Sequence, residues 1–215
     1  MIFKDRLQAA EMLAEHLRSY AGRRPLVLAI PRGAVPMGKV IADRLGGELD
    51  VVLVRKLGSP GNPEYAIGAV DESGWAYITP YARAAGADAG YIEAQKEIEL
   101  ARIRQRRVQY TPLRRALDPT GRIVIVLDDG LATGSTMIAA LHGLRYQAPE
   151  RLICAVPVAP PETVDAVGLY CDEVVCLHAP ANFQAVGQFY RDFGQVEDEE
   201  VIAILRGYEA IPRAA

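Results

Sequence analysis

Apolar residues follow two patterns along the first quarter of the chain, which are short continuous runs and helical periodicity. Continuous apolar runs at 26–30 and 49–54 are typical of strands buried on both faces of a sheet. Between them, residues 35–45 have the periodicity of an amphipathic helix that ends at a pair of glycines. An apolar stripe over residues 3–20 predicts another helix before the first strand. This part of the chain is therefore expected to alternate between helix and strand.

The same alternation returns in the second half. Apolar runs at 123–127, 152–156 and 173–177 predict three more strands. Helical periodicity at 135–146 and 161–169 separates them, and prolines in the first turn suit the second of these helices. Strands that alternate with helices favour an α/β fold with a doubly wound, mostly parallel sheet and helices on both faces.

The region between the two halves departs from this pattern. Glycine and proline are frequent from 55 to 74, which predicts a long loop. Residues 66–70 and 75–79 flank an Asp-Glu-Ser-Gly turn and indicate a β-hairpin. Residues 88–110 then predict a long, polar amphipathic helix.

These patterns predict how the chain is organised. We expect one domain over residues 1–215, with an insertion at about 58–115 that contains the hairpin and the long helix. The aromatic-rich segment and the acidic helix start near the C-terminus predict a small hood at about 180–210.

Composition limits the classes of protein that remain. Half of the 215 residues are hydrophobic, 24% are charged and the net charge is −3, which argues against the basic surface of a general nucleic-acid binder. No apolar run reaches the roughly 20 residues of a membrane helix, and the N-terminus lacks a signal-peptide layout. The three cysteines lack the spacing of a zinc site or a disulfide framework. We expect a cytoplasmic protein with no membrane partner.

The most informative motif follows the apolar run at 123–127. Two adjacent carboxylates, Asp128 and Asp129, come directly after it, and a turn rich in glycine and hydroxyl groups then opens the next helix. Ligands of doubly wound sheets bind at the carboxyl ends of the strands, and the free N–H groups of a helix start favour an anion. The motif therefore offers donors to a phosphate beside acceptors for hydroxyl groups or a hydrated cation.

A simpler interpretation is that Asp129 and Thr133 only cap the helix. That interpretation does not explain why two acids end an apolar strand, because burying unpaired charge is costly. The motif is neither a P-loop nor a dinucleotide fingerprint, since the patterns G-x-x-x-x-G-K-[ST] and G-x-G-x-x-G do not occur here. We therefore favour a binding site.

The segment from Val124 to Thr136 closely resembles the phosphoribosyl pyrophosphate motif of the type I phosphoribosyltransferases. Two further segments, 155–160 and 183–190, resemble a bacterial and archaeal subgroup of that family. The resemblance covers most of the chain. It implies transfer of 5-phosphoribosyl from phosphoribosyl pyrophosphate to a small nitrogenous acceptor, a nucleobase in nucleotide salvage, with release of pyrophosphate. It also implies a homodimer.

The resemblance assigns roles to residues at the donor site. Asp128 and Asp129 would hold the ribose hydroxyls, directly or through Mg²⁺, a metal that suits carboxylate, phosphate and water oxygens. The following turn would cradle the 5-phosphate; its residues are Gly130, Ala132, Thr133, Gly134, Ser135 and Thr136. The loop that carries Arg32 and Gly33 would bind the pyrophosphate, and we expect the Arg32–Gly33 peptide to be cis.

The resemblance also gives roles to the residues after the second strand. Arg55 and Lys56 would approach the pyrophosphate as catalytic cations, although a solvated strand end is an alternative for this pair. Residues 58–65 would form a mobile loop that excludes water from the activated ribosyl centre, against the alternative of a plain surface loop. Catalysis would consist mainly of positioning and of stabilising the charge of the leaving pyrophosphate.

The acceptor is less well defined. Enzymes of the family for 6-oxopurines often carry an Asp before the Thr-Gly pair, and Ala132 stands at that position here. The departure argues against hypoxanthine or guanine and leaves adenine, orotate, uracil, xanthine or a non-base amine open. Phe183 and Phe189 could stack on a planar base, although aromatic residues at such spacing are more often core.

Two other functions remain open at this stage. One is a regulator that binds the donor without turnover. A local basic cluster favours such a regulator if it binds nucleic acid, but a solvated helix or a dimer contact would also explain the cluster. The cluster consists of Arg102, Arg104, Arg106, Arg107, Arg114 and Arg115. The other is a hydrolase or phosphorylase that uses the same ribose-phosphate pocket.

Overall fold

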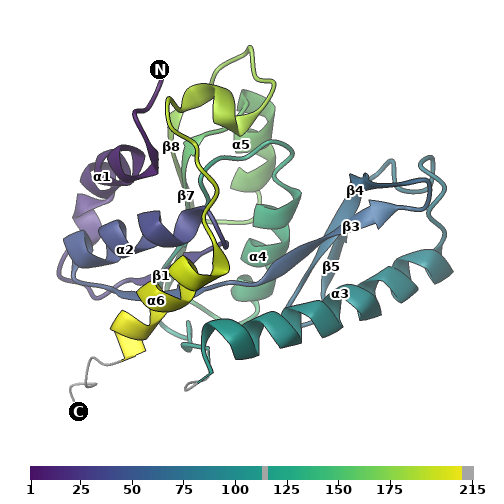
Figure 1. The fold of residues 1–215 in the computed structure, drawn as a ribbon, viewed down its shortest axis with the longest axis horizontal. Helices are drawn as coiled ribbons and strands as arrows, with labels where there is room; N and C mark the ends of the chain where they lie inside the picture. Colours follow the sequence, from purple (N-terminus) through teal and green to yellow (C-terminus); the bar gives the residue numbers. More distant parts are fainter. Residues whose placement is uncertain (113–115, 210–215) are drawn as a thin grey trace.

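The computed structural model describes residues 1–112 and 116–209, and its main body is a five-stranded parallel sheet with the order β2-β1-β6-β7-β8 (Figure 1). Every pair of neighbouring strands in this sheet runs parallel. The strands are β1 (Leu26–Ala29), β2 (Glu48–Val51), β6 (Ile123–Leu127), β7 (Arg151–Val158) and β8 (Glu173–His178). The predicted doubly wound, mostly parallel α/β fold is confirmed.

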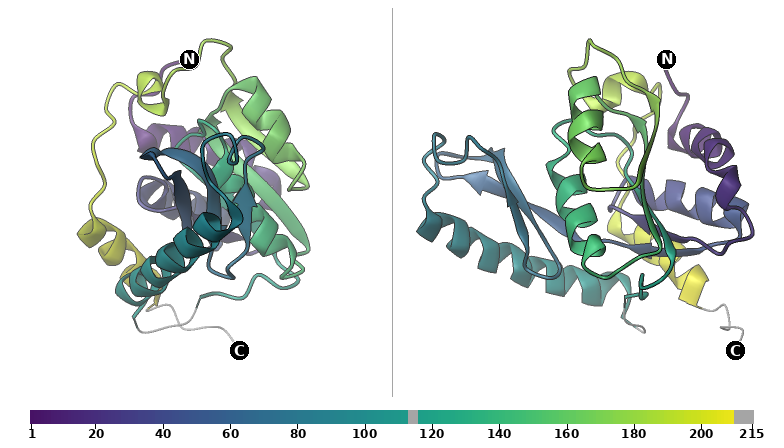
Figure 2. Two further views of the ribbon diagram at one scale, coloured as in Figure 1. Left: turned by 90° about the vertical axis from the view of Figure 1, so that its right-hand side faces the viewer. Right: turned by 180° about the vertical axis from the view of Figure 1, so that it is seen from behind.

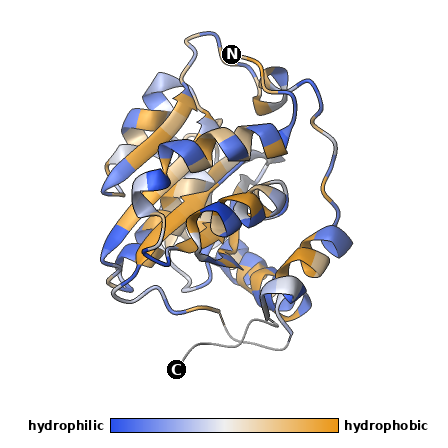
Figure 3. Cartoon of the chain, turned by 90° about the vertical axis from the view of Figure 1, so that its left-hand side faces the viewer, coloured by the Kyte–Doolittle hydropathy of each residue, from blue (hydrophilic) through white to orange (hydrophobic). Residues whose placement is uncertain are grey.

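Helices cover both faces of this sheet. On one face lie α1 (Arg6–His16) and α2 (Ala34–Leu45), and on the other lie α4 (Ser135–Arg145) and α5 (Pro161–Gly168). Successive strand residues point to opposite faces, so that Val27 packs in the first core and Leu28 in the second. Both faces are therefore buried, which is why the strands read as continuous apolar runs. Figure 3 shows these hydrophobic strands behind helices whose outer faces are hydrophilic.

The predicted loop at 55–74 was wrong. This stretch forms β3 (Val54–Ser59) and β4 (Asn62–Asp71), which pair antiparallel, and β5 (Ala76–Ile78) completes a second, three-stranded sheet. The glycine content reflects a tight hairpin with a register irregularity, not a loop: a Cβ on Gly58 would lie 2.5 Å from the carbonyl oxygen of Pro63. The hairpin predicted for 66–70 and 75–79 is confirmed, with a longer first strand.

The second sheet and the long helix α3 (Ala89–Tyr110) together form an arm that extends from the main body (Figures 1 and 2). The side chain of Asp88 caps the start of α3 by accepting a hydrogen bond from the backbone N–H of Tyr91 at 2.7 Å. The helix predicted over 88–110 is therefore confirmed.

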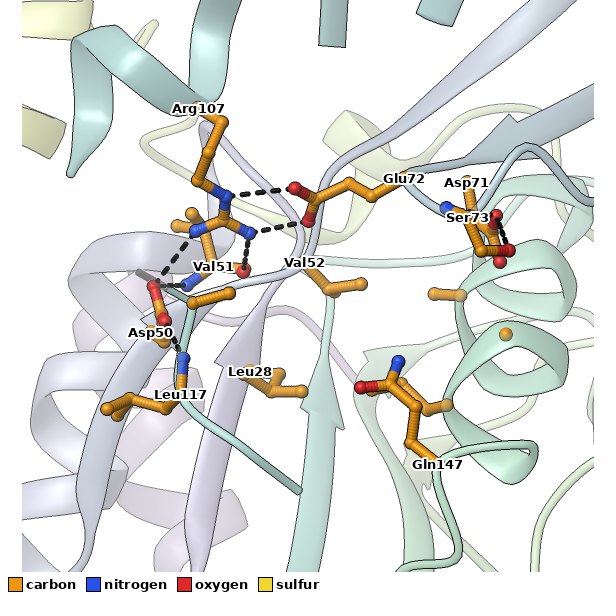
Figure 4. Close-up of a pocket in the computed structure, with 14 residues that line it drawn as sticks. Leu28, Asp50, Val51, Val52, Asp71, Glu72, Ser73, Arg107, Leu117 and Gln147 are labelled. Atoms are coloured by element: carbon orange, nitrogen blue, oxygen red, sulfur yellow. Dashed lines mark hydrogen bonds and ion pairs between the residues drawn. The ribbon is translucent and has the colours of Figure 1, made fainter. Parts of the chain in front are cut away.

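A half-buried arginine, Arg107, joins this arm to the main sheet. Arg107 of α3 donates to both carboxylate oxygens of Glu72 and, at 2.8 Å, to the carbonyl oxygen of Val51 at the end of β2 (Figure 4). It also donates at 3.2 Å to the buried carboxylate of Asp50. These residues line a cavity of about 70 Å³ between the arm and the main sheet. Arg107, assigned above to a basic surface cluster, is thus an internal ion-pair partner, and Arg114 and Arg115 lie outside the described residues.

The C-terminal part of the chain returns to the N-terminal end. A short 3₁₀ helix (Val186–Phe189) precedes Tyr190, which forms an isolated parallel bridge with Phe3. The last helix, α6 (Asp198–Glu209), contacts α2, α3 and β2. A further 3₁₀ turn, Arg18–Tyr20, follows α1. None of the helices within the described residues combines the length and the hydropathy needed to cross a bilayer.

Candidate functional site

The candidate site lies where the strand order of the main sheet reverses. After β1 the chain crosses to β2 on one side, whereas β6 is followed by β7 and β8 on the other. The carboxyl ends of β1 and β6 are adjacent, since Ala29 pairs with Leu127, and such a switch point is where doubly wound sheets bind ligands. The loop that contains Gly33 and the loop that contains Asp129 meet here: a Cβ on Gly33 would lie 2.1 Å from Asp129 Oδ2.

The two adjacent acids at this point are half-buried. Burial and the neighbouring Asp129 carboxylate raise the pKa of Asp128 well above its ordinary value, and Lys56 acts in the opposite direction. Burial also raises the pKa of Asp129, although Arg6 opposes the shift. The backbone N–H of Asp129 donates to Asp128 Oδ1 at 2.8 Å. Two buried carboxylates that repel one another are suited to a cation or to hydroxyl donors, either of which would compensate their charge.

Sequence reasoning missed an arginine at this site. Arg6 Nε donates to Asp129 Oδ2 at 2.8 Å, and the Arg6 guanidinium lies 3.8 Å from the centroid of the Phe193 ring. Tyr190, also missed, donates its hydroxyl to the backbone carbonyl of Asp129 at 2.7 Å. No local signal marks Arg6, because it is 123 residues from Asp129 in sequence and begins an ordinary capped helix.

The turn after the two acids brings hydrogen-bond donors together at the start of α4. Gly134 adopts a left-handed conformation (φ 72°) as the N-cap, and it carries no side chain that could satisfy the first N–H groups of the helix. Thr133 Oγ1 and Ser135 Oγ are 3.2 Å apart beside these groups. The hydroxyl of Thr163 in α5 stabilises the turn by donating a hydrogen bond to the carbonyl oxygen of Ala132 at 2.7 Å. The N–H of Ser135 donates weakly to Thr133 Oγ1 at 3.5 Å. The turn therefore combines the backbone N–H groups of a helix start, hydroxyl groups and the positive end of a helix dipole.

Gly130 and Thr136 complete this segment. Gly130 has a φ of 156°, and a Cβ there would meet the Val186 side chain at 2.5 Å, so the segment that contains Val186 packs directly onto the turn. Thr136 is half-buried in the first turn of α4. The structure thus brings all the residues predicted for the 5-phosphate into one turn and helix start.

The loop after β1 contains a cis peptide, but not the predicted one. The cis bond joins Pro31 to Arg32 and not Arg32 to Gly33. The sequence motif locates the loop, whereas the particular bond depends on how the chain leaves β1. The Arg32 guanidinium lies near two acids at the start of α6: Nη1 is 3.4 Å from Glu197 Oε2 and 3.9 Å from Asp198 Oδ1.

The structure separates Arg55 from Lys56, since neighbouring residues of a strand point to opposite faces. Lys56 is exposed, and its positive charge lowers the pKa of Asp128 against the larger effect of burial. Arg55 Nε instead donates to Glu99 on α3 at 2.8 Å. Of the two cations, Arg55 is the one engaged by a carboxylate of the arm, whereas the charge of Lys56 acts on Asp128.

The remaining predicted residues lie in two other places. Phe183 and Phe189 stack on each other, with centroids 5.4 Å apart, and pack with the hydrophobic core. Residues 58–65 form the tip of the β3–β4 hairpin, where Tyr91 donates its hydroxyl to the carbonyl oxygen of Gly58 at 2.9 Å.

The part of the chain that the structure describes forms no metal site from protein ligands alone. Within residues 1–112 and 116–209, no group of three or more His, Cys, Asp or Glu side chains could enclose an ion. The acid pair does fit Mg²⁺, because that ion commonly takes one or two protein carboxylates and completes its shell with water and substrate phosphates.

Comparison with known proteins agrees with this geometry. Residues 4–193 match the phosphoribosyl transferase domain family. Two relatives from Mycobacterium tuberculosis strains CDC 1551 and H37Rv, named "Putative phosphoribosyl transferase MT0597" and "Putative phosphoribosyl transferase Rv0571c", are each 40% identical over 95% of this chain. This chain spans only 46% of the length of these relatives.

A solved structure extends the comparison to the fold. The crystal structure of TT1426 from Thermus thermophilus is 46% identical to this chain, with a TM-score of 0.82. The match covers 97% of this chain and 99% of that one. The chain therefore belongs to the phosphoribosyl transferase domain family.

Proposed function

We propose that this chain transfers the 5-phosphoribosyl group of phosphoribosyl pyrophosphate to a nitrogen nucleophile and releases pyrophosphate. The observation that carries the proposal is the meeting of the acid pair, the open start of α4 and the Arg32–Gly33 loop at one switch point. A donor with a phosphate, two hydroxyl groups and a pyrophosphate requires these three kinds of partner in one crevice.

Each part of the crevice has a separate task. The carboxylates of Asp128 and Asp129 accept hydrogen bonds from the ribose hydroxyls, and the start of α4 binds the 5-phosphate through backbone N–H groups. Arg32 and Lys56 stabilise the charge that develops on the departing pyrophosphate. Mg²⁺, when bound, supplies further neutralisation of that leaving group. The anomeric carbon is thereby held for attack by the acceptor nitrogen from the opposite side.

The acceptor site lies toward the hood. Phe193 is partly exposed next to Arg6 and stacks on Tyr190, with ring centroids 4.9 Å apart. This pair is closer to the acid pair than the predicted Phe183–Phe189 stack, because Tyr190 contacts Asp129 directly. Ala132 lacks a carboxylate that could act on a base nitrogen, so we infer that the acceptor is neither hypoxanthine nor guanine.

The alternative of a nucleic-acid-binding regulator has less support. Its argument depends on the basic cluster of α3, yet Arg102, Arg106 and Arg107 each pair with a carboxylate of this chain. Internal pairing leaves less of their charge for a phosphate backbone. We therefore favour turnover, in a cytoplasmic homodimer that serves nucleotide salvage.

An acceptor screen tests the proposal. The protein is incubated with phosphoribosyl pyrophosphate, Mg²⁺ and single candidate acceptors (adenine, orotate, uracil, xanthine, hypoxanthine, guanine and simple amines), and pyrophosphate is measured. We expect release that requires one acceptor and is lost in the Asp128→Asn/Asp129→Asn variant. Release without any acceptor would assign a hydrolase instead. Tight donor binding with no release in any mixture would assign a regulator.

A further inference from the structure

A cavity of about 160 Å³ lies between β3 and the helix α3, outside the acid-pair crevice. Among the residues that the structure describes, its lining consists of arginine and glutamine side chains, which are Arg55, Arg102, Gln105, Arg106 and Gln109. We propose that this cavity is a second anion site, which binds the polyphosphate group of a nucleotide or of an inorganic polyphosphate. The proposal does not depend on the transferase reaction.

The sequence places these donors on one face of α3. Residues 102, 105, 106 and 109 follow the i, i+3, i+4, i+7 spacing that aligns side chains along one side of a helix. Arg55 faces them from β3, on the side of the strand opposite to Lys56. The cavity therefore receives donors from two elements of the arm, and three of its five lining side chains carry a positive charge.

A buried carboxylate orients two of the arginines. Glu99 has a side chain that is only 8% exposed, and it accepts from Arg55 Nε through one oxygen and from Arg102 Nη1 through the other. Each guanidinium uses one nitrogen in this contact, and a guanidinium carries five N–H donors in a fixed fork. Both arginines therefore keep donors for a ligand while Glu99 restricts their conformations.

The third arginine connects the cavity to the candidate pyrophosphate loop. Arg106 Nη1 donates to the Tyr110 hydroxyl at 2.9 Å and to Asp198 Oδ1 at 3.3 Å. The same oxygen of Asp198 is 3.9 Å from Arg32 Nη1. An anion in the cavity would compete with Asp198 for Arg106, so occupancy would alter the surroundings of Arg32.

The chemistry of the lining selects the kind of anion. Three guanidinium groups face two carboxylates, so an excess of positive charge remains for a ligand. Guanidinium forks match the paired oxygens of phosphate groups, and glutamine amides add neutral donors. No apolar side chain of the described residues lines the cavity to hold a base or a ring. The lining thus favours a chain of phosphate groups.

Site-resolved titration tests this proposal. Inorganic triphosphate is added to the ¹⁵N-labelled full chain without Mg²⁺, and the arginine Nε–H signals and the backbone N–H signals are followed. We expect saturable shifts of Arg55, Arg102 and Arg106 with one apparent dissociation constant, and little change at Arg104, which is exposed on the same helix. Shifts confined to residues 31–33 and 132–136 would overturn the proposal, because they would report only the donor site.

Variants provide a second readout by calorimetry. Arg102→Gln should weaken triphosphate binding by about tenfold, since one charge-assisted contact is lost, and Arg102→Gln/Arg106→Gln should weaken it further. The matched control Arg104→Gln should bind as the unchanged protein does. Because Arg106 also contacts Asp198, folding of the double variant is checked by circular dichroism. If the double variant is misfolded, the comparison of Arg102→Gln with Arg104→Gln tests the proposal. Equal losses in Arg102→Gln and Arg104→Gln would overturn the proposal, since general charge would then explain binding.

A parallel titration with a nucleotide identifies the source of the phosphate groups. Adenosine triphosphate is titrated under the same conditions. Equal affinities assign the site to the phosphate groups alone, and tighter binding of the nucleotide adds recognition of the nucleoside at the rim; both results support the proposal. Binding of inorganic triphosphate but not of adenosine triphosphate would restrict the site to inorganic polyphosphate. Binding of neither compound would overturn the proposal.

Discussion

Arg6 Nε donates to Asp129 Oδ2 across 2.8 Å, and the two side chains are only 13% and 16% exposed. The same arginine donates from Nη1 to the carbonyl oxygen of Gly194 at 2.6 Å and lies over the Phe193 ring. The start of α1, the end of β6 and the hood therefore meet at one carboxylate. Arg6 opposes the upward shift of the pKa of Asp129, so it helps to keep that group ionised in a buried position.

We expect Arg6→Gln to weaken binding of phosphoribosyl pyrophosphate with Mg²⁺ by about tenfold, because one charge-assisted contact that orients Asp129 is lost. Calorimetric titration measures the effect. Arg18→Gln, which removes an exposed arginine just after α1, is the matched control and should leave binding unchanged. Tighter binding in Arg6→Gln would instead show that Arg6 competes with the donor for Asp129.

Removal of both acidic charges should separate function from stability. In Asp128→Asn/Asp129→Asn we expect donor affinity to fall by more than about 100-fold, since several charge-assisted hydrogen bonds and the cation site are lost. The free protein should unfold at a higher denaturant concentration than the unchanged chain, because burial disfavours the two charges in the folded state. Equilibrium denaturation and calorimetry measure the two effects. Unchanged donor affinity would contradict the site assignment.

The raised pKa values of the acid pair also predict a pH dependence. A carboxyl group whose pKa is higher in the folded state stabilises the free protein below the ordinary aspartate value of about 4, and this contribution is lost as the pH rises through the raised value. Binding of a cation and of ribose hydroxyls requires the ionised form, so donor affinity should increase with pH over that same interval. Titrations at a series of pH values should give a steeper rise for the unchanged protein than for Asp128→Asn. Equal slopes would contradict a role for this pair.

Gly33 is expected to tolerate no side chain while Asp129 stays in place. Its φ of −57° suits alanine, so the obstacle is contact: the added Cβ would lie 2.1 Å from Asp129 Oδ2 and 3.0 Å from Arg6 Nε. We expect Gly33→Ala to cost about 1–3 kcal/mol of stability and to weaken donor binding, because the carboxylate or the loop must move. Denaturation and calorimetry check both effects. Gly207→Ala, at a position with no atom within 4 Å of the new Cβ, is the control and should be neutral or slightly stabilising.

The parts of the fold that the sequence predicts well are those governed by local periodicity. Strands buried on both faces, such as β6, read as continuous apolar runs, and α3 begins at a residue that caps it through its own side chain. The hairpin β3–β4 was missed because its pairing depends on the partner strand and its glycines resemble those of a loop.

The candidate site divides in the same way. Asp128 and the helix start at Gly134 lie within one segment, so a local motif reveals them. Arg6, Tyr190 and Phe193 come from opposite ends of the chain, and only the tertiary fold brings them to Asp129. Arg55 and Lys56 point to opposite faces because residues 54–59 form a strand. The sequence pattern predicts a loop there, so it does not reveal that the two side chains separate.

Arg107 should be essential to the attachment of the arm. Its side chain donates to Asp50, to Glu72 and to the carbonyl oxygen of Val51, and the carboxylate of Asp50 is fully buried. Loss of one member of a buried ion pair is strongly unfavourable because the buried carboxylate loses a charged partner. We therefore expect Arg107→Ala to reduce the free energy of unfolding by about 3 kcal/mol.

Denaturant unfolding of the full chain measures this loss, and Arg104→Ala on the exposed side of the same helix is the matched control, with an expected change of at most about 0.5 kcal/mol. Hydrogen exchange adds a local readout. Amides of β3, β4 and α3 should lose more protection in Arg107→Ala than those of β6 and β7, because the contact joins the arm to the main sheet. Uniform loss of protection over both sheets would contradict a local fastening role and would indicate that Arg107 supports the whole fold.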